Sequence, residues 1–361
     1  MERKKIILLA TSDINYDQRL QKVSSSLASF GAEVLLVGRA LKTSIPLQKR
    51  PFEQKRVTCF FNKGVFFYLE INIRFFFLLL GKKADIVCAN DADTLLSAIG
   101  ANYFKSFELI YDSHEYFTEV PELQNKNGKK AIWSFIERWG VRKSKARYTV
   151  NESLAKLFFK QYHSKFEVIL NVPNSASDKI PQFKENILLY QGALNEGRGL
   201  ETLIRAMTKI EGKLILAGKG DLQEELRELV KNLNLSHKIN FVGNLLPEEL
   251  RVRTLQAKIG INILEGQSLN YYYSLANKFF DYMHAGVPSL NMDFPEYQFI
   301  NDKFKVAVLI PSLDESNIVS ALNKLLMDEP YYHKMKENCL LAKKFYNWEL
   351  EALKLKSIYQ L

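Results

Sequence analysis

Residues 187–207, ILLYQGALNEGRGLETLIRAM, decide the fold. The segment begins with an apolar run, continues through a turn that holds three glycines, and ends in a helical pattern from residue 200. A short apolar run of this kind predicts a strand buried on both faces. A strand that leads through a tight turn into a helix is the building unit of a parallel sheet. The segment therefore predicts an α/β domain with a doubly wound parallel sheet.

The same alternation of apolar runs and helical patterns extends along the chain in two series. The first series predicts strands at residues 5–10, 33–37, 57–61, 85–89, 108–111, 147–150 and 167–170. The second series predicts strands at residues 187–190, 213–217, 239–242, 259–263, 287–290 and 306–309. Between the two series, the sequence NVPNSASDKIPQFKE is rich in Pro, Ser, Asn and charge, which is typical of a linker.

We therefore expect two Rossmann-like domains, at residues 1–172 and 186–340, joined by a linker at 173–185. The chain of 361 residues is long enough for two such domains. Residues 331–361 have a helical pattern throughout, with an apolar face. A terminal helix with such a face must pack on a surface already formed. We expect the segment 341–361 to be a helix that packs back on the first domain.

Cysteines and the amino terminus indicate a reduced, cytoplasmic protein. The three cysteines are widely spaced and form no CxxC motif, so neither a disulfide framework nor a zinc site is expected. Three basic residues precede the apolar residues 6–10, as in a signal peptide, but this run is short and ends at Thr11. A first buried strand is the better interpretation.

Positive charge is concentrated in the first half. Residues 1–170 hold 27 Lys and Arg against 17 Asp and Glu, which accounts for the whole net charge of +10. The excess predicts an anionic partner, or else only a solubilising surface. Residues 65–80 are mostly apolar but include Glu70, Asn72 and Arg74, so they are not a transmembrane helix. They form either a buried helix or a peripheral contact with an anionic membrane. Nucleic-acid binding is not expected, because no stacking motif accompanies the charge.

Two segments of the second half are candidates for binding an anion. In the turn 191–199, Gly192 and Gly199 allow the backbone to approach a ligand, and Arg198 can donate to a phosphate. In the next candidate helix, Ser274 is the expected N-cap and Gly286 the expected end. The alternative to the first site is a Gly-rich turn with a surface arginine.

The helix between residues 274 and 286 places its polar and apolar side chains on different faces. Four polar residues, Asn277, Lys278, Asp281 and His284, share one face, and Phe279, Phe280 and Met283 are expected to be core. Lys278 could hold a phosphate while Asp281 holds a diol. The alternative is an exposed lysine–aspartate pair.

In the first half, the sequence YDSHE at residues 111–115 ends a strand and places His114 where catalytic groups cluster. The alternative is a structural histidine. Asp17 and Arg19 follow the first strand and are expected to form an ion pair. Asp91 and Asp93 are expected to cap a helix rather than to bind a metal.

Together these motifs resemble the GT-B-fold, family-4-type retaining glycosyltransferases, along the whole chain. The resemblance rests on the segments DQR at 17–19, YDSHE at 111–115, the turn at 192–199, NKFFDYM…GVP at 277–288 and WEL…Y at 348–359. It implies two domains facing a central cleft, the first for the acceptor and the second for a nucleotide-sugar donor. It further implies a metal-independent, hexosyltransferase-type enzyme without a cofactor, which acts in the synthesis of cell-surface polysaccharide or glycoconjugate. The acceptor would be a saccharide or lipid-linked, and the enzyme would be cytoplasmic, with the inner face of the plasma membrane as an open alternative.

The resemblance also implies roles for individual residues. His114, Arg198 and Lys278 would be catalytic, and Asp17, Arg19 and Glu115 would lie on the acceptor side. The donor would be bound by Gly192, Arg198, Gly199, Val242, Gly243, Asn244, Ser274, Asn277, Lys278 and Asp281. Asp281 would bind the ribose, Arg198 and Lys278 the diphosphate, and residues 242–244 the base.

Two positions depart from the family pattern. Where the family often has a glutamate, this chain has Tyr273, and an arginine expected after the first glycine is replaced by Ala193. These departures keep open a partner protein that binds a sugar nucleotide without catalysis. A nucleotide-sugar epimerase of the same fold is a further alternative.

Overall fold

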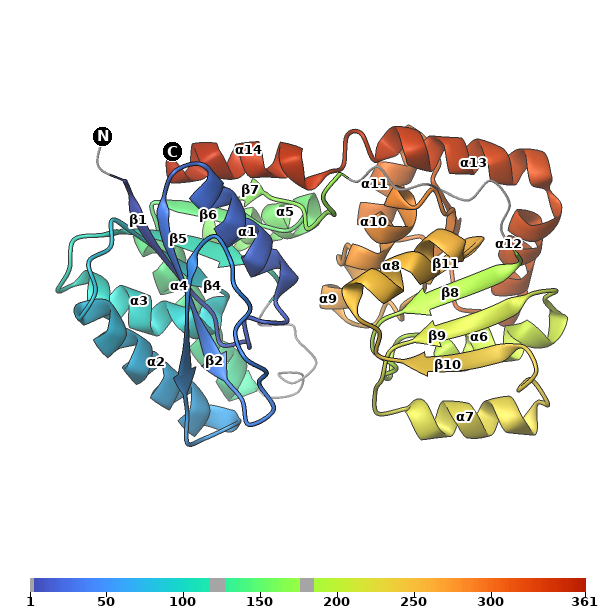
Figure 1. Ribbon diagram of the computed structural model, residues 1–361, viewed down its shortest axis with the longest axis horizontal. Helices are drawn as coiled ribbons and strands as arrows, with labels where there is room; N and C mark the ends of the chain where they lie inside the picture. Colours follow the sequence, from blue (N-terminus) through green and yellow to red (C-terminus); the bar gives the residue numbers. More distant parts are fainter. Residues whose placement is uncertain (1–2, 117–126, 176–184) are drawn as a thin grey trace. The chain divides into compact units, whose positions relative to one another are not determined.

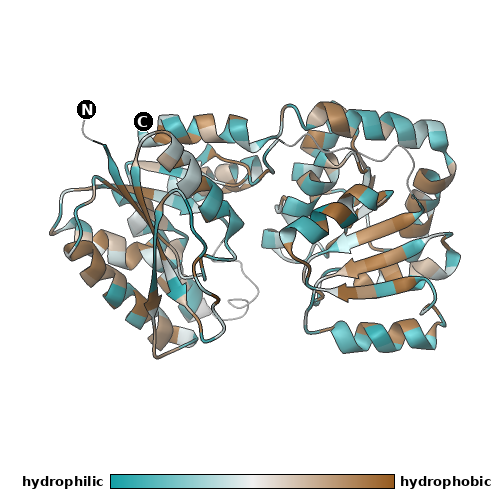
Figure 2. Ribbon diagram, viewed as in Figure 1, coloured by the Kyte–Doolittle hydropathy of each residue, from teal (hydrophilic) through white to brown (hydrophobic). Residues whose placement is uncertain are grey.

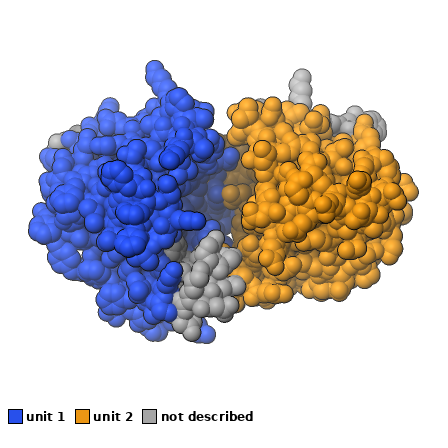
Figure 3. Space-filling model, turned by 90° about the horizontal axis from the view of Figure 1, so that it is seen from below, with its two compact units in different colours: residues 1–171, 350–361 blue, residues 172–349 orange. Residues whose placement is uncertain are grey.

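The computed structural model describes residues 3–116, 127–175 and 185–361. The chain divides into two compact units, unit 1 (Met1–Asn171 and Leu350–Leu361) and unit 2 (Val172–Glu349), which are coloured separately in Figure 3. Each unit is an α/β domain around a parallel sheet, as the sequence predicts (Figure 1). Most of the linker expected at 173–185 lies outside the described residues.

Unit 1 contains a seven-stranded parallel sheet with the order β3-β2-β1-β4-β5-β6-β7. Its strands are β1 (Lys5–Leu9), β2 (Glu33–Ala40), β3 (Glu53–Thr58), β4 (Ile86–Asn90), β5 (Glu108–Ser113), β6 (Ala146–Thr149) and β7 (Glu167–Val168). Its helices are α1 (Gln18–Ser29), α2 (Gly64–Leu80), η1 (Ala92–Thr94), α3 (Leu95–Asn102), α4 (Asn127–Lys143) and α5 (Glu152–Tyr162). The central strands β1 and β4 are almost entirely buried because helices cover both faces of the sheet (Figure 1).

The strand expected at residues 57–61 is displaced toward the amino terminus. The observed strand β3 begins at Glu53 and ends at Thr58, and Phe60 and Phe61 follow it as exposed side chains. β3 lies at the edge of the sheet and is polar, so the apolar pattern does not mark it.

Unit 2 contains a six-stranded parallel sheet with the order β10-β9-β8-β11-β12-β13. Its strands are β8 (Ile187–Gln191), β9 (Lys213–Ala217), β10 (Ile239–Gly243), β11 (Ile259–Asn262), β12 (Ser289–Met292) and β13 (Ala307–Ile310). Its helices are α6 (Leu200–Ala206), η4 (Met207–Lys209), α7 (Gln223–Asn232), α8 (Pro247–Gln256), α9 (Leu269–Tyr272), α10 (Asn277–His284), α11 (Pro295–Phe304), α12 (Glu315–Met327) and α13 (Glu329–Ala342).

Helix α10 packs tightly over the middle of this sheet. The hydroxyl of Tyr282 donates a hydrogen bond of 2.8 Å to the carbonyl of Leu189 in β8. A Cβ at Gly260 in β11 would lie 2.3 Å from the Tyr282 ring, so only glycine fits beneath it. Phe279, Phe280 and Met283 are buried, as expected. This packing fixes the position of the polar residues on the same helix.

The carboxy-terminal segment is not one continuous helix. Helix α13 ends at Ala342 and α14 (Trp348–Tyr359) begins six residues later, so the helix expected over 331–361 is interrupted. The side-chain amide of Asn347 donates to the carbonyls of Lys343 and Lys344, at 3.3 and 2.9 Å. A side chain that bonds neighbouring carbonyls in this way competes with helix formation.

From Leu350 onward, α14 belongs to unit 1. Tyr359 is buried, and its hydroxyl lies 3.1 Å from that of Tyr148 in β6. The backbone amide of Leu170 donates to Glu351, and the ammonium of Lys4 donates to the carbonyls of Tyr359 and Gln360. The last helix therefore completes the first sheet domain and lies beside the start of β1 (Figure 1).

Candidate functional site

The turn after β8 brings the backbone of unit 2 close to a buried ammonium group. Gly192, Gly197 and Gly199 have φ angles of +136°, +79° and +63°. These angles favour glycine over other residues. A Cβ at Gly192 would lie 3.2 Å from Nζ of Lys278, so a side chain there would crowd the ammonium. Glycine keeps the space next to Lys278 clear.

Lys278 and Arg198 are two cations with little compensating charge. Lys278 is 8% exposed, and its Nζ lies 3.9 Å from the centroid of the Tyr190 ring. The guanidinium of Arg198 lies 5.0 Å from the centroid of Tyr271. Among the residues that the structure describes, neither Nζ of Lys278 nor Nε of Arg198 has a hydrogen-bond partner. Buried donors normally have partners, so this pair is suited to receive an anion.

The pKa of Lys278 reflects the same environment. Burial, and next the charge of Arg198, lower this pKa from its ordinary value to about 7, although Asp281 acts in the opposite direction. Lys278 therefore lies within electrostatic reach of both Arg198 and Asp281. A bound anion would favour the charged ammonium and restore its pKa toward the ordinary range.

Asp281 lies one turn after Lys278 on α10. Two consecutive side-chain hydrogen bonds orient the carboxylate of Asp281. Its Oδ2 accepts 2.7 Å from Nε2 of Gln191, the last residue of β8. The Oε1 of Gln191 in turn accepts 3.1 Å from the hydroxyl of Thr254. Sequence reasoning did not single out Gln191 or Thr254, because nothing in their local pattern distinguishes them from ordinary core-edge polar residues.

Other predicted residues of unit 2 behave differently. Asn277 is exposed and Lys278 is buried, so they do not share one solvent-facing polar face. The Nε2 of His284 lies 2.7 Å from the carbonyl of Tyr346, which gives this histidine a structural contact. Ser274 is not the N-cap: α10 begins at Asn277 after Ala276, and the Ser274 hydroxyl donates to Tyr271. The expected end of the helix is correct, since Gly286 has a φ of +60° just after it.

The predicted base-binding turn lies on the edge strand β10. Val242 and Gly243 end that strand, Gly243 has a φ of +70°, and Asn244 follows as an exposed residue. Because all strands are parallel, this turn shares the carboxyl edge of the sheet with the turn after β8. Strand β9 separates the two.

In unit 1, His114 is held between two carboxylates. Its Nε2 lies 2.8 Å from Oδ2 of Asp112, and its Nδ1 lies 3.3 Å from Oδ2 of Asp91. Carboxylates next to both ring nitrogens favour an imidazolium, in which both nitrogens donate. Burial lowers the pKa of His114, but Asp112 and then Asp91 outweigh it and raise that pKa well above its ordinary value.

Arg19 is the second cation of this network. Its Nη2 lies 3.1 Å from Oδ1 of Asp112, and its Nη1 donates 2.9 Å to the carbonyl of Ile169. The expected ion pair of Arg19 with Asp17 is therefore wrong. Asp17 instead caps α1, because its side chain accepts from the amide of Leu20. Glu115, predicted for the acceptor side, follows His114 as an exposed residue.

Asp91 contacts His114 on the side opposite to Asp112, and its own backbone has an unusual conformation. It has a φ of +59°, a region that residues other than glycine rarely adopt. Its Oδ1 accepts 2.8 Å from the amide of His114, so its carboxylate does not cap η1 as expected. Such strain is often found at functional sites. Asp93 is also not a cap: it accepts 2.6 Å from Thr11, and burial and then Asp91 raise its pKa to about 7.

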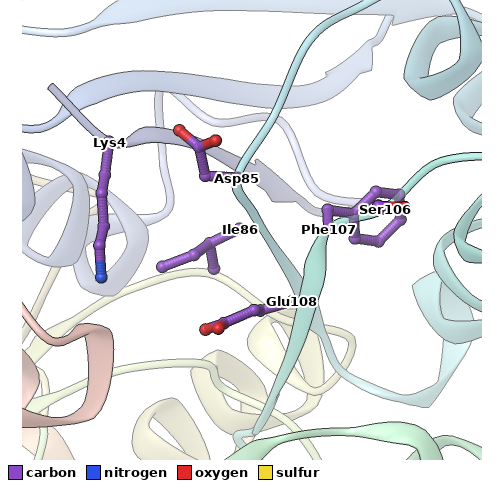
Figure 4. Close-up of a pocket in the computed structure, with 6 residues that line it drawn as sticks. All are labelled: Lys4, Asp85, Ile86, Ser106, Phe107 and Glu108. Carbon is purple, nitrogen blue, oxygen red and sulfur yellow. The ribbon is translucent and has the colours of Figure 1, made fainter. Parts of the chain in front are cut away.

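A separate hollow in unit 1 lies at the opposite edge of the sheet. It is lined by Lys4, Asp85, Ile86, Ser106, Phe107 and Glu108 (Figure 4). These residues lie at the amino ends of β1, β4 and β5, whereas ligands of parallel sheets bind beyond the carboxyl ends. The groups around His114 are therefore the better candidate.

The two parallel-sheet domains define a GT-B fold, and the chain is similar to solved structures of this class over nearly its whole length. Sucrose-phosphate synthase from Thermosynechococcus elongatus matches with a TM-score of 0.80 at 18% identity, covering 99% of this chain and 98% of that one. The Anabaena protein Alr3699/HepE, solved in complex with UDP, matches with a TM-score of 0.75 at 13% identity, covering 99% and 100%. At these identities the likeness shows the fold.

Sequence comparison finds a family match for most of unit 2. Residues 174–340 match the family described as glycosyl transferases group 1. An uncharacterized glycosyltransferase of Methanocaldococcus jannaschii is 41% identical over 66 residues, 17% of each chain. An α-1,4-N-acetyl-D-galactosaminyltransferase of Campylobacter jejuni is 27% identical over 141 residues, 36% of this chain and 38% of that protein. The alignments thus span well under half of these relatives. Together, the findings support a glycosyltransferase of GT-B fold.

Proposed function

We propose that the chain transfers a sugar from a nucleotide-sugar donor to a saccharide or lipid-linked acceptor. One observation carries the proposal: Lys278 holds a buried ammonium, unpartnered among the described residues, beside Arg198 and an open glycine turn. A nucleotide sugar contains a diphosphate, whose negative charge would balance the positive charges of Lys278 and Arg198. The family match covers the same unit.

In this proposal each polar group of unit 2 has a defined task. Arg198 and Lys278 bind the diphosphate and stabilise the negative charge that develops as it departs. Asp281, oriented by Gln191, accepts hydrogen bonds from the ribose hydroxyls. Ser274, Asn277 and residues 242–244 line the rest of the donor site. In unit 1, His114 is the proposed active-site histidine and, as an imidazolium, acts as a donor and not as a base. Asp17, Arg19 and Glu115 belong to the acceptor side, where Asp17 and Arg19 act by holding the structure.

We propose a retaining reaction. The acceptor oxygen attacks the anomeric carbon from the face that the diphosphate leaves, the bond from that carbon to the diphosphate oxygen breaks, and the acceptor proton passes to the departing phosphate. The products are a glycoside and a nucleoside diphosphate. The reaction needs no metal in this scheme, because the two cations supply the positive charge. The setting we propose is cytoplasmic synthesis of cell-surface polysaccharide or glycoconjugate.

The test combines binding with turnover. A panel of nucleotide sugars, beginning with UDP-glucose because the Anabaena protein was also solved with it, is screened by thermal shift. The stabilising donor is then assayed for transfer in the presence of EDTA. Arg198→Ala should lower transfer by orders of magnitude and leave the fold intact. Arg205→Ala, which removes an exposed arginine from α6, is the matched control and should retain full transfer.

The outcomes separate the candidate functions. Unchanged turnover in Arg198→Ala would refute the phosphate role. Conversion of the donor sugar without an acceptor would indicate an epimerase. Donor binding without transfer or hydrolysis would indicate a non-catalytic partner protein, the alternative that Tyr273 and Ala193 keep open. Loss of transfer in EDTA would overturn the metal-independent scheme.

A further inference from the structure

We propose that the outer face of α2, extended by neighbouring residues of α3 and α4, docks unit 1 on an anionic lipid bilayer. This surface lies outside the donor site and does not depend on it. It is called the α2 surface below and consists of Phe60, Phe61, Val65, Phe66, Leu69, Ile73, Phe77, Tyr103, Phe104, Ile132 and Phe135, all exposed.

Helix α2 is apolar on two opposite faces. Its inner face, with Phe67, Ile71 and Phe75, is buried in unit 1. Its outer face carries Phe66 and Phe77, 66% and 65% exposed, with Leu69 and Ile73 between them at helical spacing. A helix that is hydrophobic all round is normally buried on all sides. Figure 2 shows the hydrophobic colour along the ribbon of α2 and α3. The outer face of α2 therefore lacks a covering partner in the described part of the chain.

Aromatic contacts join the outer face of α2 to its surroundings. Phe61 and Phe66 have ring centroids 5.4 Å apart, and Phe76 lies 5.4 Å from Phe77 and 6.0 Å from Phe104. Toward α4, Tyr68 contacts Trp133 with centroids 5.1 Å apart. Ile132 and Phe135 on α4 are 61% and 68% exposed. These contacts group exposed side chains of the α2 surface with neighbours on α2, α3 and α4, and such a patch of clustered apolar side chains marks an interaction surface.

Positive charge surrounds this patch. The segments 63–83 and 127–143 contain nine Lys and Arg residues but only two carboxylates, Glu70 and Glu137. Both carboxylates are occupied. Glu70 pairs with Arg74 at 2.8 Å, and Glu137 is buried and accepts from the hydroxyls of Tyr111 and Tyr162. The patch therefore lies on segments that carry a large excess of positive charge.

Two cations lie directly over aromatic rings of the surface. Arg74 lies 5.3 Å from the centroid of Phe60, and Lys143 lies 5.1 Å from that of Tyr103. Aromatic side chains that enter the headgroup region beside Lys and Arg are typical of helices lying on a membrane. Each basic residue near an anionic surface adds to the attraction. Charge complementarity thus selects an anionic bilayer as the occupant.

The geometry indicates a helix that lies on the bilayer. In residues 3–116, 127–175 and 185–361, no helix has the length and apolar character needed to span a membrane. The inner face of α2 also packs in the core, with Ile71 and Phe75 fully buried, so the helix cannot leave unit 1 without unfolding it. Only its outer side chains can enter the lipid.

The experiment measures partitioning of the full chain onto vesicles by co-sedimentation. Vesicles of phosphatidylcholine with phosphatidylglycerol should bind the protein, pure phosphatidylcholine should bind it weakly, and raised salt should release it. Phe66→Ser/Phe77→Ser should lower partitioning by about tenfold or more. Phe299→Ser in unit 2, which removes another exposed phenylalanine, is the matched control and should leave partitioning unchanged.

Lys129→Ala/Lys130→Ala should weaken binding to the anionic vesicles only. Fluorescence of Trp133 and Trp139 on α4 should shift to the blue on binding, because both are partly exposed. Equal binding to neutral and anionic vesicles, or none to either, would overturn the proposal. So would a dimer in light scattering that Phe66→Ser/Phe77→Ser dissociates, since a second copy would then cover the surface. The donor thermal shift of these variants should be unchanged, which keeps this test separate from that of the proposed function.

Discussion

The carboxylate of Asp112 lies 2.8 Å from Nε2 of His114, and the same carboxylate lies 3.1 Å from a guanidinium nitrogen of Arg19. Asp112 is fully buried. Burial would raise its pKa, but Arg19 and then His114 outweigh burial, and the pKa of Asp112 falls below its ordinary value. One buried anion therefore serves two cations, and the three residues should act as a unit in stability.

Asp112→Asn should be strongly destabilising. The change leaves Arg19, which is 4% exposed, without its counter-charge. Removing one partner of a buried ion pair costs roughly 3–5 kcal/mol. Urea denaturation should show this loss in the free energy of unfolding. Asp17→Asn is the control, because asparagine can also cap α1, and it should cost little. Equal small losses in both variants would contradict the network.

His114 should make stability depend on pH in one direction. Its pKa is raised in the folded protein, so the stabilisation from the imidazolium is fully present below the unfolded pKa of about 6.5. It is lost as pH rises through the folded pKa. The difference in unfolding free energy between the protein and His114→Gln should therefore be large near pH 6 and shrink at alkaline pH. A difference that grows with pH would contradict this assignment.

Lys278 should lower the free energy of unfolding when no ligand is bound. Its pKa is about 7 in the folded protein and about 10.4 when unfolded, so the unfolded chain binds more protons between these values. Stability from this group therefore rises with pH across that interval. Lys278→Met should raise the free energy of unfolding by roughly 3–5 kcal/mol at neutral pH and by less near pH 10. Destabilisation by Lys278→Met at neutral pH would argue against a strained, uncompensated ammonium.

Binding of a diphosphate should be coupled to protonation of the same lysine. Above about pH 7 the free protein holds Lys278 partly neutral, and the anion must draw in a proton. The affinity for UDP-glucose should therefore fall as pH rises through about 7. Isothermal titration in buffers of different ionisation enthalpy should detect proton uptake. Lys278→Met should bind more weakly, with no such uptake, and uptake that persists in this variant would assign the proton to another group.

The last helix should be necessary for the stability of unit 1. Tyr359 is buried and contacts Tyr148, so Tyr359→Ala should cost roughly 3–5 kcal/mol by leaving a cavity. Tyr359→Phe keeps the ring and removes only the hydroxyl contact, so it should cost about 1 kcal/mol. Urea denaturation compares the two. A negligible effect of Tyr359→Ala would show that α14 adds little to the domain.

The sequence predicts the two sheets well because buried parallel strands are continuous apolar runs that stand out from amphipathic helices. The edge strand β3 was misplaced because its polar residues carry no such signal, and the aromatic residues after it are exposed at the surface. The break between α13 and α14 was missed because Asn347 is ordinary in composition, and only its two backbone contacts reveal its role.

The candidate sites were predictable where the residues are close in sequence. Two short motifs contain the predicted donor-site residues Gly192, Arg198, Lys278 and Asp281, and their spacing can be recognised in the sequence. Partners that come from distant strands were not predicted. Arg19, which pairs with Asp112, lies on α1. Asp91, which contacts His114, lies in the turn after β4, and no sequence pattern predicts its backbone conformation. Burial of Lys278 likewise depends on how α10 packs on the sheet, which spacing along the helix cannot give.

Unit 1 takes its residues from both extremes of the chain, 1–171 and 350–361. During synthesis on a ribosome, the first sheet is therefore made long before the helix that covers Tyr148. Tyr148 therefore stays uncovered by α14 until all of unit 2 has been translated. Domains generally fold as units during synthesis, with the amino-terminal domain first. In this chain the order is reversed, because unit 2 is the first unit to be completely translated.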